Sequence, residues 1–108
     1  MATKGYVVMR YTGPWEVGSD AHEKWGKAAR SAFRDAMPAF KAAGGMSFKH
    51  WVDYFNRMPR SLFVFEFDTL EKALAWLISP ANKTLLDEVL HAGAQDMDVS
   101  VSTLYEEG

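Results

Sequence analysis

The chain has 108 residues, a formal net charge of −2 and no cysteine. This length suits one domain, so we expect a single domain over residues 1–108. The lack of cysteine excludes disulfides, thiolate metal sites and a cysteine nucleophile. Mixed charges without a basic stripe give no sign of nucleic-acid binding. No run of about 18 apolar residues is present to span a membrane, so a cytoplasmic protein is expected.

The first element predicted along the chain is a strand at 5–11, GYVVMRY, which is rich in β-branched and aromatic residues. The segment 12–19 contains two glycines and a proline and is expected to be a loop.

A long helix is predicted next, beginning near Asp20. Asp20 can cap the helix, with Glu23 as its capping-box partner. Pro38 is expected to end or kink this helix because it lacks a backbone donor, and the Gly44-Gly45 pair stops any helix that continues beyond Pro38. The apolar residues that recur at helical spacing are Trp25, Ala29, Ala32, Phe33, Ala36 and Met37.

Two strands are predicted at 46–55 and 61–67, and the short NRMPR segment between them favours an antiparallel hairpin. A second helix then starts at Asp68 or Thr69. Its predicted apolar stripe is Leu70, Ala73, Leu74 and Leu77.

Pro80 interrupts a helical pattern, and the serine before it explains why. Ser79 suits an N-cap and Pro80 suits the first helical position, where a missing N–H costs nothing, so a third helix is predicted to restart here. Gly93 ends this helix, and a last strand is predicted at 97–107. The apolar residues of the third helix are Leu85, Leu86, Val89 and Leu90.

The predicted order is strand, helix, strand, strand, helix, helix, strand. This is the split βαβ pattern of α+β ferredoxin-like folds, with a four-stranded antiparallel sheet and helices on one face. The other face would be bare and is most simply covered by the same face of a second copy, which predicts a homodimer.

Side chains alternate across strands, so each predicted strand has a helix-facing row. If the phenylalanines of 61–67 pack on the helices, the helix-facing set is Phe63, Phe65, Phe67, Phe48, His50, Val52, Tyr54, Val7, Met9 and Tyr11. The opposite face would carry Arg10, Lys49, Trp51, Asp53 and Glu66, whose charges can pair across a dimer. A slip of one residue in the hairpin would invert the 46–55 set.

Three stretches carry a family resemblance: MATKGYVVMRY at 1–11, MPAFK at 37–41 and FEFDTLEKALAWLISPAN at 65–82. In order and spacing they resemble the dimeric α+β barrel superfamily. The nearest likeness is to the stress-responsive A/B-barrel family, which includes olivetolic acid cyclase-like proteins and is related to antibiotic-biosynthesis monooxygenases. The resemblance implies a homodimer with facing sheets, and one pocket per subunit between the helices and their own sheet.

The chain departs from this family at its catalytic positions. The family's cyclase chemistry uses a tyrosine where this chain has Trp76 and a histidine where it has Asn82. Two further histidines of the family are replaced by Gly5 and Ser61. The resemblance therefore implies the scaffold without necessarily implying the cyclase reaction.

The candidate catalytic residues are His50, Tyr54, Tyr11 and Asn82. An imidazole near neutrality in an apolar pocket suits a general base, although His50 can equally be an ordinary strand histidine. The two tyrosines can orient a phenol or carbonyl, or simply pack as strand aromatics. Asn82 can hold a substrate oxygen or an oxyanion, or stand in solvent on the first turn of its helix.

The candidate substrate-binding residues are Trp76, Phe48, Phe63, Phe65, Phe67, Met9 and Arg30. Trp76 can stack on a flat ligand or fill the core, and Arg30 can bind a carboxylate or stay solvated. His22 and His91 are interpreted as structural residues near helix ends. The histidines form no short-spaced metal motif, so no metal and no cofactor are expected.

These observations favour a cofactor-independent enzyme that acts on an apolar or aromatic, polyketide-like molecule. It would work by acid–base catalysis as a cyclase, isomerase or monooxygenase. The alternative is a non-catalytic ligand-binding or stress-responsive dimer. Haem binding is a third hypothesis, because related barrels use a helix tryptophan near Trp76, but they also use a histidine where this chain has Leu86.

Overall fold

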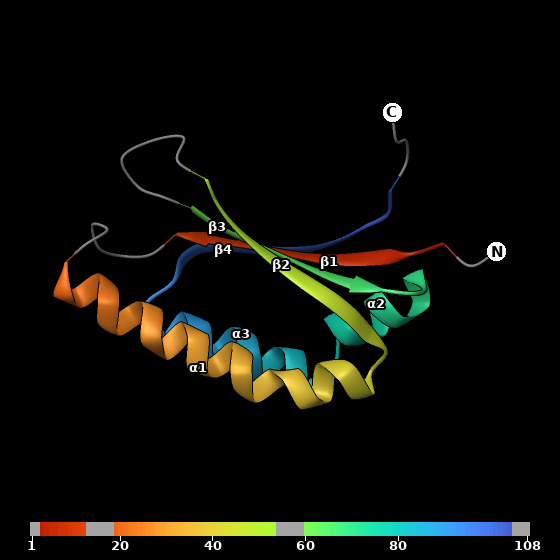
Figure 1. Ribbon diagram of the computed structural model, residues 1–108, viewed down its shortest axis with the longest axis horizontal. Helices are drawn as coiled ribbons and strands as arrows, with labels where there is room; N and C mark the ends of the chain where they lie inside the picture. The colour runs from red at the N-terminus through yellow and green to blue at the C-terminus, as the bar shows by residue number, and fades with distance from the viewer. Residues whose placement is uncertain (1–2, 13–18, 54–59, 105–108) are drawn as a thin grey trace.

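One antiparallel sheet with helices on a single face makes up the architecture (Figure 1). The computed structural model describes residues 3–12, 19–53 and 60–104. The elements are β1 (Gly5–Thr12), α1 (Asp20–Ala42), β2 (Gly45–Asp53), β3 (Arg60–Phe67), α2 (Leu70–Leu77), α3 (Pro80–Ala92) and β4 (Gln95–Ser102). The strand order is β2-β3-β1-β4. The predicted α+β ferredoxin-like fold is thus confirmed.

Helix α1 begins at Asp20, as predicted, but its N-cap is Ser19 rather than Asp20. The Ser19 side chain accepts a hydrogen bond from the His22 amide at 3.1 Å, and its backbone is extended. Asp20 is the first helical residue, where its carboxylate lies near the positive end of the helix dipole. The predicted capping box with Glu23 is therefore wrong by one residue, since the third residue after the true N-cap is His22.

Pro38 does not end α1, contrary to one of the two predicted outcomes. The helix continues through Pro38 to Ala42 and stops before Gly44, whose φ of 95° is unfavourable for other residues. The turn after the proline carries Phe40, which is 2% exposed and packs its ring edge-on against Phe65, Phe67 and Trp76. This burial offsets the lost backbone hydrogen bond.

The break between α2 and α3 is formed by the predicted N-cap serine and the proline that follows it. The Ser79 side chain accepts from the Asn82 amide at 3.1 Å, and Pro80 occupies the first turn of α3. Thr69, one of the two predicted starts of α2, caps that helix by accepting from the Lys72 amide.

Two leucines of the predicted helix stripes are exposed instead of buried. Leu74 is 47% exposed and Leu90 is 45% exposed, whereas Trp76 and Val89 are fully covered. Ala73, Leu85 and Val89 of the predicted stripes are buried, and in α2 Trp76 is buried in addition, because tertiary packing, not apolar character alone, selects the buried face. The last strand also differs, since β4 spans Gln95–Ser102 instead of 97–107.

The register of the sheet confirms the predicted helix-facing row. Met9 and His50 both pair with Phe63, on either side of β3. Val7 and Phe48 likewise pair with Phe65. Tyr54 belongs to the same predicted row but lies outside the described residues.

The opposite face of the sheet has no helix over it (Figure 1). Arg10 forms an ion pair there with Asp98 at 3.4 Å, and Glu66 with Lys4 at 3.8 Å. Arg10 and Glu66 therefore have partners within the chain, and pairing of this face across a dimer stays a prediction. None of the helices in the described segments is both long and apolar enough to span a membrane.

Candidate functional site

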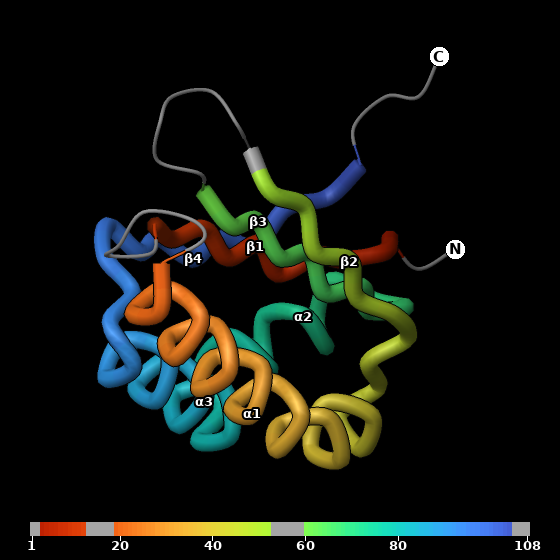
Figure 2. Tube along the Cα trace, turned by 60° about the vertical axis from the view of Figure 1, so that its left-hand side comes forward, coloured from red at the N-terminus to blue at the C-terminus, as the bar shows by residue number. Residues whose placement is uncertain are grey.

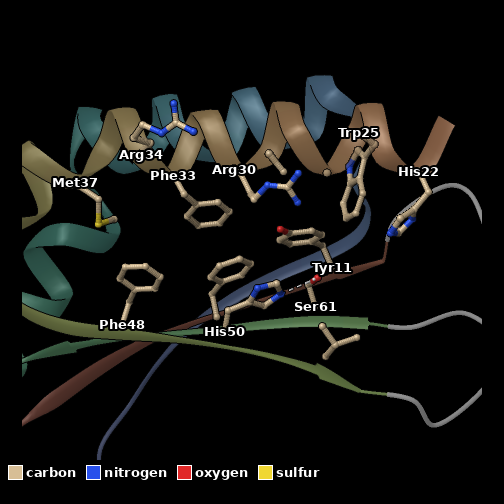
Figure 3. Close-up of a pocket in the computed structure, with 14 residues that line it drawn as sticks. Tyr11, His22, Trp25, Arg30, Phe33, Arg34, Met37, Phe48, His50 and Ser61 are labelled. Atoms are coloured by element: carbon tan, nitrogen blue, oxygen red, sulfur yellow. Dashed lines mark hydrogen bonds between the residues drawn. The ribbon is translucent and has the colours of Figure 1, made fainter. Parts of the chain in front are cut away.

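A cavity of about 540 Å³ lies between α1 and the sheet, at the end of the layer where α1 begins (Figure 3). Its lining comes from α1 and from strands β1, β2 and β3. The lining residues are Tyr11, His22, Trp25, Gly26, Ala29, Arg30, Phe33, Arg34, Met37, Phe48, His50, Val52, Ser61 and Phe63. The walls are mostly apolar, with a small number of polar groups, as expected for a small-molecule site.

Three polar side chains meet on the sheet side of the cavity. Tyr11 pairs with Ser61 across β1 and β3, and Ser61 pairs on its other side with Val52, two residues along β2 from His50. The His50 Nε2 atom lies 3.2 Å from the Ser61 hydroxyl oxygen, within hydrogen-bond distance. The imidazole also stacks on Phe63, with ring centroids 4.1 Å apart and an interplanar angle of 10°. These contacts fix the plane and orientation of the imidazole.

The electrostatics of this group favour neutral forms. Burial lowers the pKa of His50 below its ordinary value of 6.5, so its imidazole is neutral at pH 7. Burial raises the pKa of Tyr11 far above its ordinary value of 10, while a hydrogen bond with the Ser61 side chain acts in the opposite direction. The site therefore combines a neutral base with a phenol that keeps its proton.

Helix α1 supplies the roof of the cavity. Trp25 and Phe33 lie two turns apart on the face of α1 that meets the sheet. Trp25 packs edge-on against Tyr11, with ring centroids 5.7 Å apart, and Phe33 stacks on Phe63, with ring centroids 4.0 Å apart. Phe63 is thus covered by Phe33 and by the His50 imidazole, and the residues that line the cavity lie on both sides of this stack, from His22 to Met37 along α1.

Several predicted site residues lie away from the cavity. Trp76 is 1% exposed and packs against Phe40 and Phe67, and Asn82 is fully buried with its Nδ2 donating to the Leu77 carbonyl at 3.0 Å. Asn82 is therefore neither solvated nor open to a substrate. The predicted residues that are buried in the core and do not line the cavity are Trp76, Asn82, Met9, Phe65 and Phe67.

The packing around Gly5 excludes one of the histidines that the family's cyclase chemistry uses. A Cβ at Gly5 would lie 2.7 Å from the Ala73 Cβ and 2.8 Å from the Leu70 Cα, so no side chain fits at Gly5. Of the four catalytic positions implied by the resemblance, only Ser61 lines the cavity. The chain therefore lacks the arrangement on which that cyclase chemistry depends.

Several lining residues were not predicted as part of the site. His22, Phe33 and Met37 come from α1, and Ser61 comes from β3. The helical positions carried a usable signal, because Trp25, Ala29, Phe33 and Met37 recur at intervals of four on the face that meets the sheet. Within the described residues, no cluster of three or more potential ligands could hold a metal ion.

No protein-family model matches the sequence, and no curated protein matches it either. Solved structures do. SnoaB from Streptomyces nogalater, a cofactor-independent oxygenase, is 12% identical, with 98% of this chain and 97% of SnoaB covered and a TM-score of 0.67. A dimeric ferredoxin-like protein from an uncultured marine organism is 16% identical, with 98% of this chain and 99% of that protein covered and a TM-score of 0.65. A proposed antibiotic biosynthesis monooxygenase from Deinococcus radiodurans is 15% identical, with 96% of this chain and 92% of that protein covered and a TM-score of 0.63.

The chain has the fold of the dimeric α+β barrel superfamily. The cavity lies between α1 and the sheet, on the side of the sheet where the resemblance implied a pocket. The haem hypothesis depends on Trp76. This residue does not line the cavity, because it is packed in the core at the other end of the layer between the helices and the sheet.

Proposed function

We propose that the protein is a cytoplasmic, homodimeric and cofactor-independent enzyme that acts on an aromatic, polyketide-like molecule. The observation that carries this proposal is the His50 imidazole, which lines a mostly apolar cavity and is oriented by Ser61 and Phe63, with its pKa lowered by partial burial. A neutral, positioned imidazole is well suited to remove a proton at physiological pH. The similarity in fold to a cofactor-independent oxygenase supports the same class of chemistry.

In the proposed mechanism, His50 Nδ1 removes a proton from a phenol or an activated carbon of the substrate. The Nε2 atom stays at the Ser61 hydroxyl, which holds the ring in place as the imidazolium forms. Tyr11, whose phenol stays protonated, donates a hydrogen bond to the substrate oxygen that gains negative charge. The resulting anion can cyclise, isomerise or react with dioxygen.

The homodimer in this proposal places two bare sheet faces against each other. Trp51, which is 46% exposed on this face, and the half-buried Leu62 and Val64 of β3 give the face an apolar component. Two similar structures are described as dimeric ferredoxin-like proteins. Light scattering coupled to size-exclusion chromatography tests this, and a mass near 12.2 kDa at micromolar concentration would contradict it.

The catalytic test uses His50→Gln, which keeps an amide near Ser61 but cannot act as a base. Oxygen uptake and product formation are measured with a panel of polycyclic phenols and phenolic ketones. We expect turnover to fall by about 100-fold or more in His50→Gln. His91→Gln, at an exposed histidine on α3, is the matched control and should match the wild type. Unchanged turnover in His50→Gln would show that the base is elsewhere.

The second candidate function is ligand binding without turnover. It is favoured by the exposure of the cavity on the β2 side, where Phe48 is 44% and Val52 is 40% exposed. A closed site would shield a reactive anion from water better than this one does. Tight binding of an aromatic probe to both the wild type and His50→Gln, with no product from any phenol tested, would favour this second function.

A further inference from the structure

The charged side chains that line the cavity in the described part of the chain are both cationic. They are two arginines of α1, Arg30 and Arg34, which lie one helical turn apart, and no aspartate or glutamate is among the lining residues that the structure describes. Neither arginine forms an ion pair with any residue in the described parts of the chain. The described lining thus presents positive charge without an acidic partner.

The two arginines differ in direction (Figure 3). The Arg30 guanidinium hangs from α1 into the space between the helix and the sheet, above Tyr11. The Arg34 guanidinium lies level with the α1 ribbon and does not hang below it toward the sheet. Only Arg30 therefore aims its donors at the volume that a ligand would occupy.

Gly26 makes room for this placement. A Cβ at Gly26 would lie 3.3 Å from an Arg30 guanidinium nitrogen, which is closer than ordinary van der Waals contact. The Arg30 side chain thus folds back over the preceding turn, next to Trp25. Glycine inside a helix is less favourable than alanine, so its presence below Arg30 is consistent with a need for that space.

We propose that Arg30 binds a carboxylate on the aromatic ligand, so that the preferred substrates are aromatic acids. This inference deepens the proposed function and rests on it only in placing an aromatic ligand in the same cavity. A guanidinium offers paired N–H donors that match the two oxygens of a carboxylate. The carboxylate would supply the counter-ion that the cavity lacks, while the apolar walls contact the ring. His50 and Tyr11 then act on the part of the ligand nearer the sheet.

The test compares two probes of nearly equal shape, 2-naphthoate and its neutral analogue 2-naphthamide. Binding is followed by isothermal titration calorimetry, with circular dichroism as the check on folding. The wild type is expected to prefer the carboxylate by about tenfold or more, as charge-assisted hydrogen bonds at partly exposed sites do. Arg30→Gln should abolish the preference, while Arg34→Gln, the matched control one turn away, should keep it.

A second variant separates binding from helix stability. Gly26→Ala should raise the melting temperature, because alanine favours the helix, yet weaken 2-naphthoate binding by about two- to fivefold through displacement of Arg30. The proposal would be overturned by a preference that survives Arg30→Gln, by equal losses in Arg30→Gln and Arg34→Gln, or by failure of the wild type to bind either probe at millimolar concentration. A carboxylate preference that persists while His50→Gln leaves turnover intact would contradict the catalytic role of His50 alone.

Discussion

The two ends of the helix–sheet layer are built from the same kind of residue and yet differ in packing. Strand β3 runs through both ends, with Phe63 at the open end and Phe67 at the closed end. At the closed end, where α2 lies on the helix side of the sheet (Figure 2), Phe67 meets Phe40 of α1 and Trp76 of α2, and each of the three rings is 2% exposed or less. At the open end α1 alone covers strands β2 and β3, and the cavity remains. An aromatic-rich layer therefore becomes a core or a binding site according to how many helices cover it.

The largest expected effect is at the closed end. Trp76→Ala removes a side chain that is 1% exposed and leaves a void between α1, α2 and the sheet. We expect the free energy of unfolding to fall by about 3–5 kcal/mol, as for other buried aromatic truncations. Phe48→Ala at the open end, where the ring is 44% exposed, should lower the free energy of unfolding by about 1 kcal/mol or less. Urea denaturation followed by circular dichroism measures both, and equal losses would contradict the distinction between the two ends.

A smaller effect is expected for the buried amide of the closed end. Asn82→Ala removes the donor to the Leu77 carbonyl, which then loses its side-chain partner at the junction of α2 and α3. The free energy of unfolding should fall by about 1–2 kcal/mol. Thr84→Ala, an exposed change in the same helix, is the control and should be near neutral. If Asn82→Ala instead altered ligand binding at unchanged stability, Asn82 would belong to a site.

At the open end, Tyr11→Phe should separate function from stability. The change removes only the hydroxyl that hydrogen-bonds with Ser61, so the free energy of unfolding should fall by about 0.5–1.5 kcal/mol. Turnover should fall by about 100-fold if the phenol supports a developing negative charge. Kinetics with the phenol panel and urea denaturation of the same preparation give both values. A variant with full activity would remove Tyr11 from the mechanism.

The smallest effect concerns the dependence of stability on pH. The pKa of His50 is below 6.5 in the folded state, so the unfolded chain binds a proton more readily. The stability contribution of a neutral His50 is complete above pH 6.5 and is lost as the pH falls from 6.5 through the lower folded pKa. His50→Gln should therefore lose less stability than the wild type over this interval. Proton NMR titration of the His50 ring gives the pKa directly, and a value above 6.5 would reverse the prediction.

Much of the fold could be predicted from local patterns. Strand alternation placed His50 and Phe63 on one face, and the Ser79-Pro80 pair located the restart of a helix, because both signals depend on neighbouring residues only. The sequence left open whether Pro38 ends or only kinks α1, since long-range packing of Phe40 decides whether the helix continues.

The candidate site was harder to predict than the fold. Alternation identified His50, Tyr11 and Phe48 as helix-facing, but it could not show which part of that face is covered by α2 and α3. Trp76 and Asn82 were assigned to the site from the positions that the family resemblance implies, although both are buried at the closed end. Ser61 was noted only as a departure from a family pattern, because its contact with His50 joins two strands and is invisible along the chain.

The tight approach of α2 to the first strand has a consequence for engineering. At Gly5 the helix backbone comes so near that even a methyl group would collide with it. Grafting a histidine from a related cyclase onto that position would fail unless the whole second helix were rebuilt further from the sheet. New chemistry in this scaffold is better introduced on the outermost strand beside Phe48 and Val52, where side chains already reach solvent and mutations need displace no backbone.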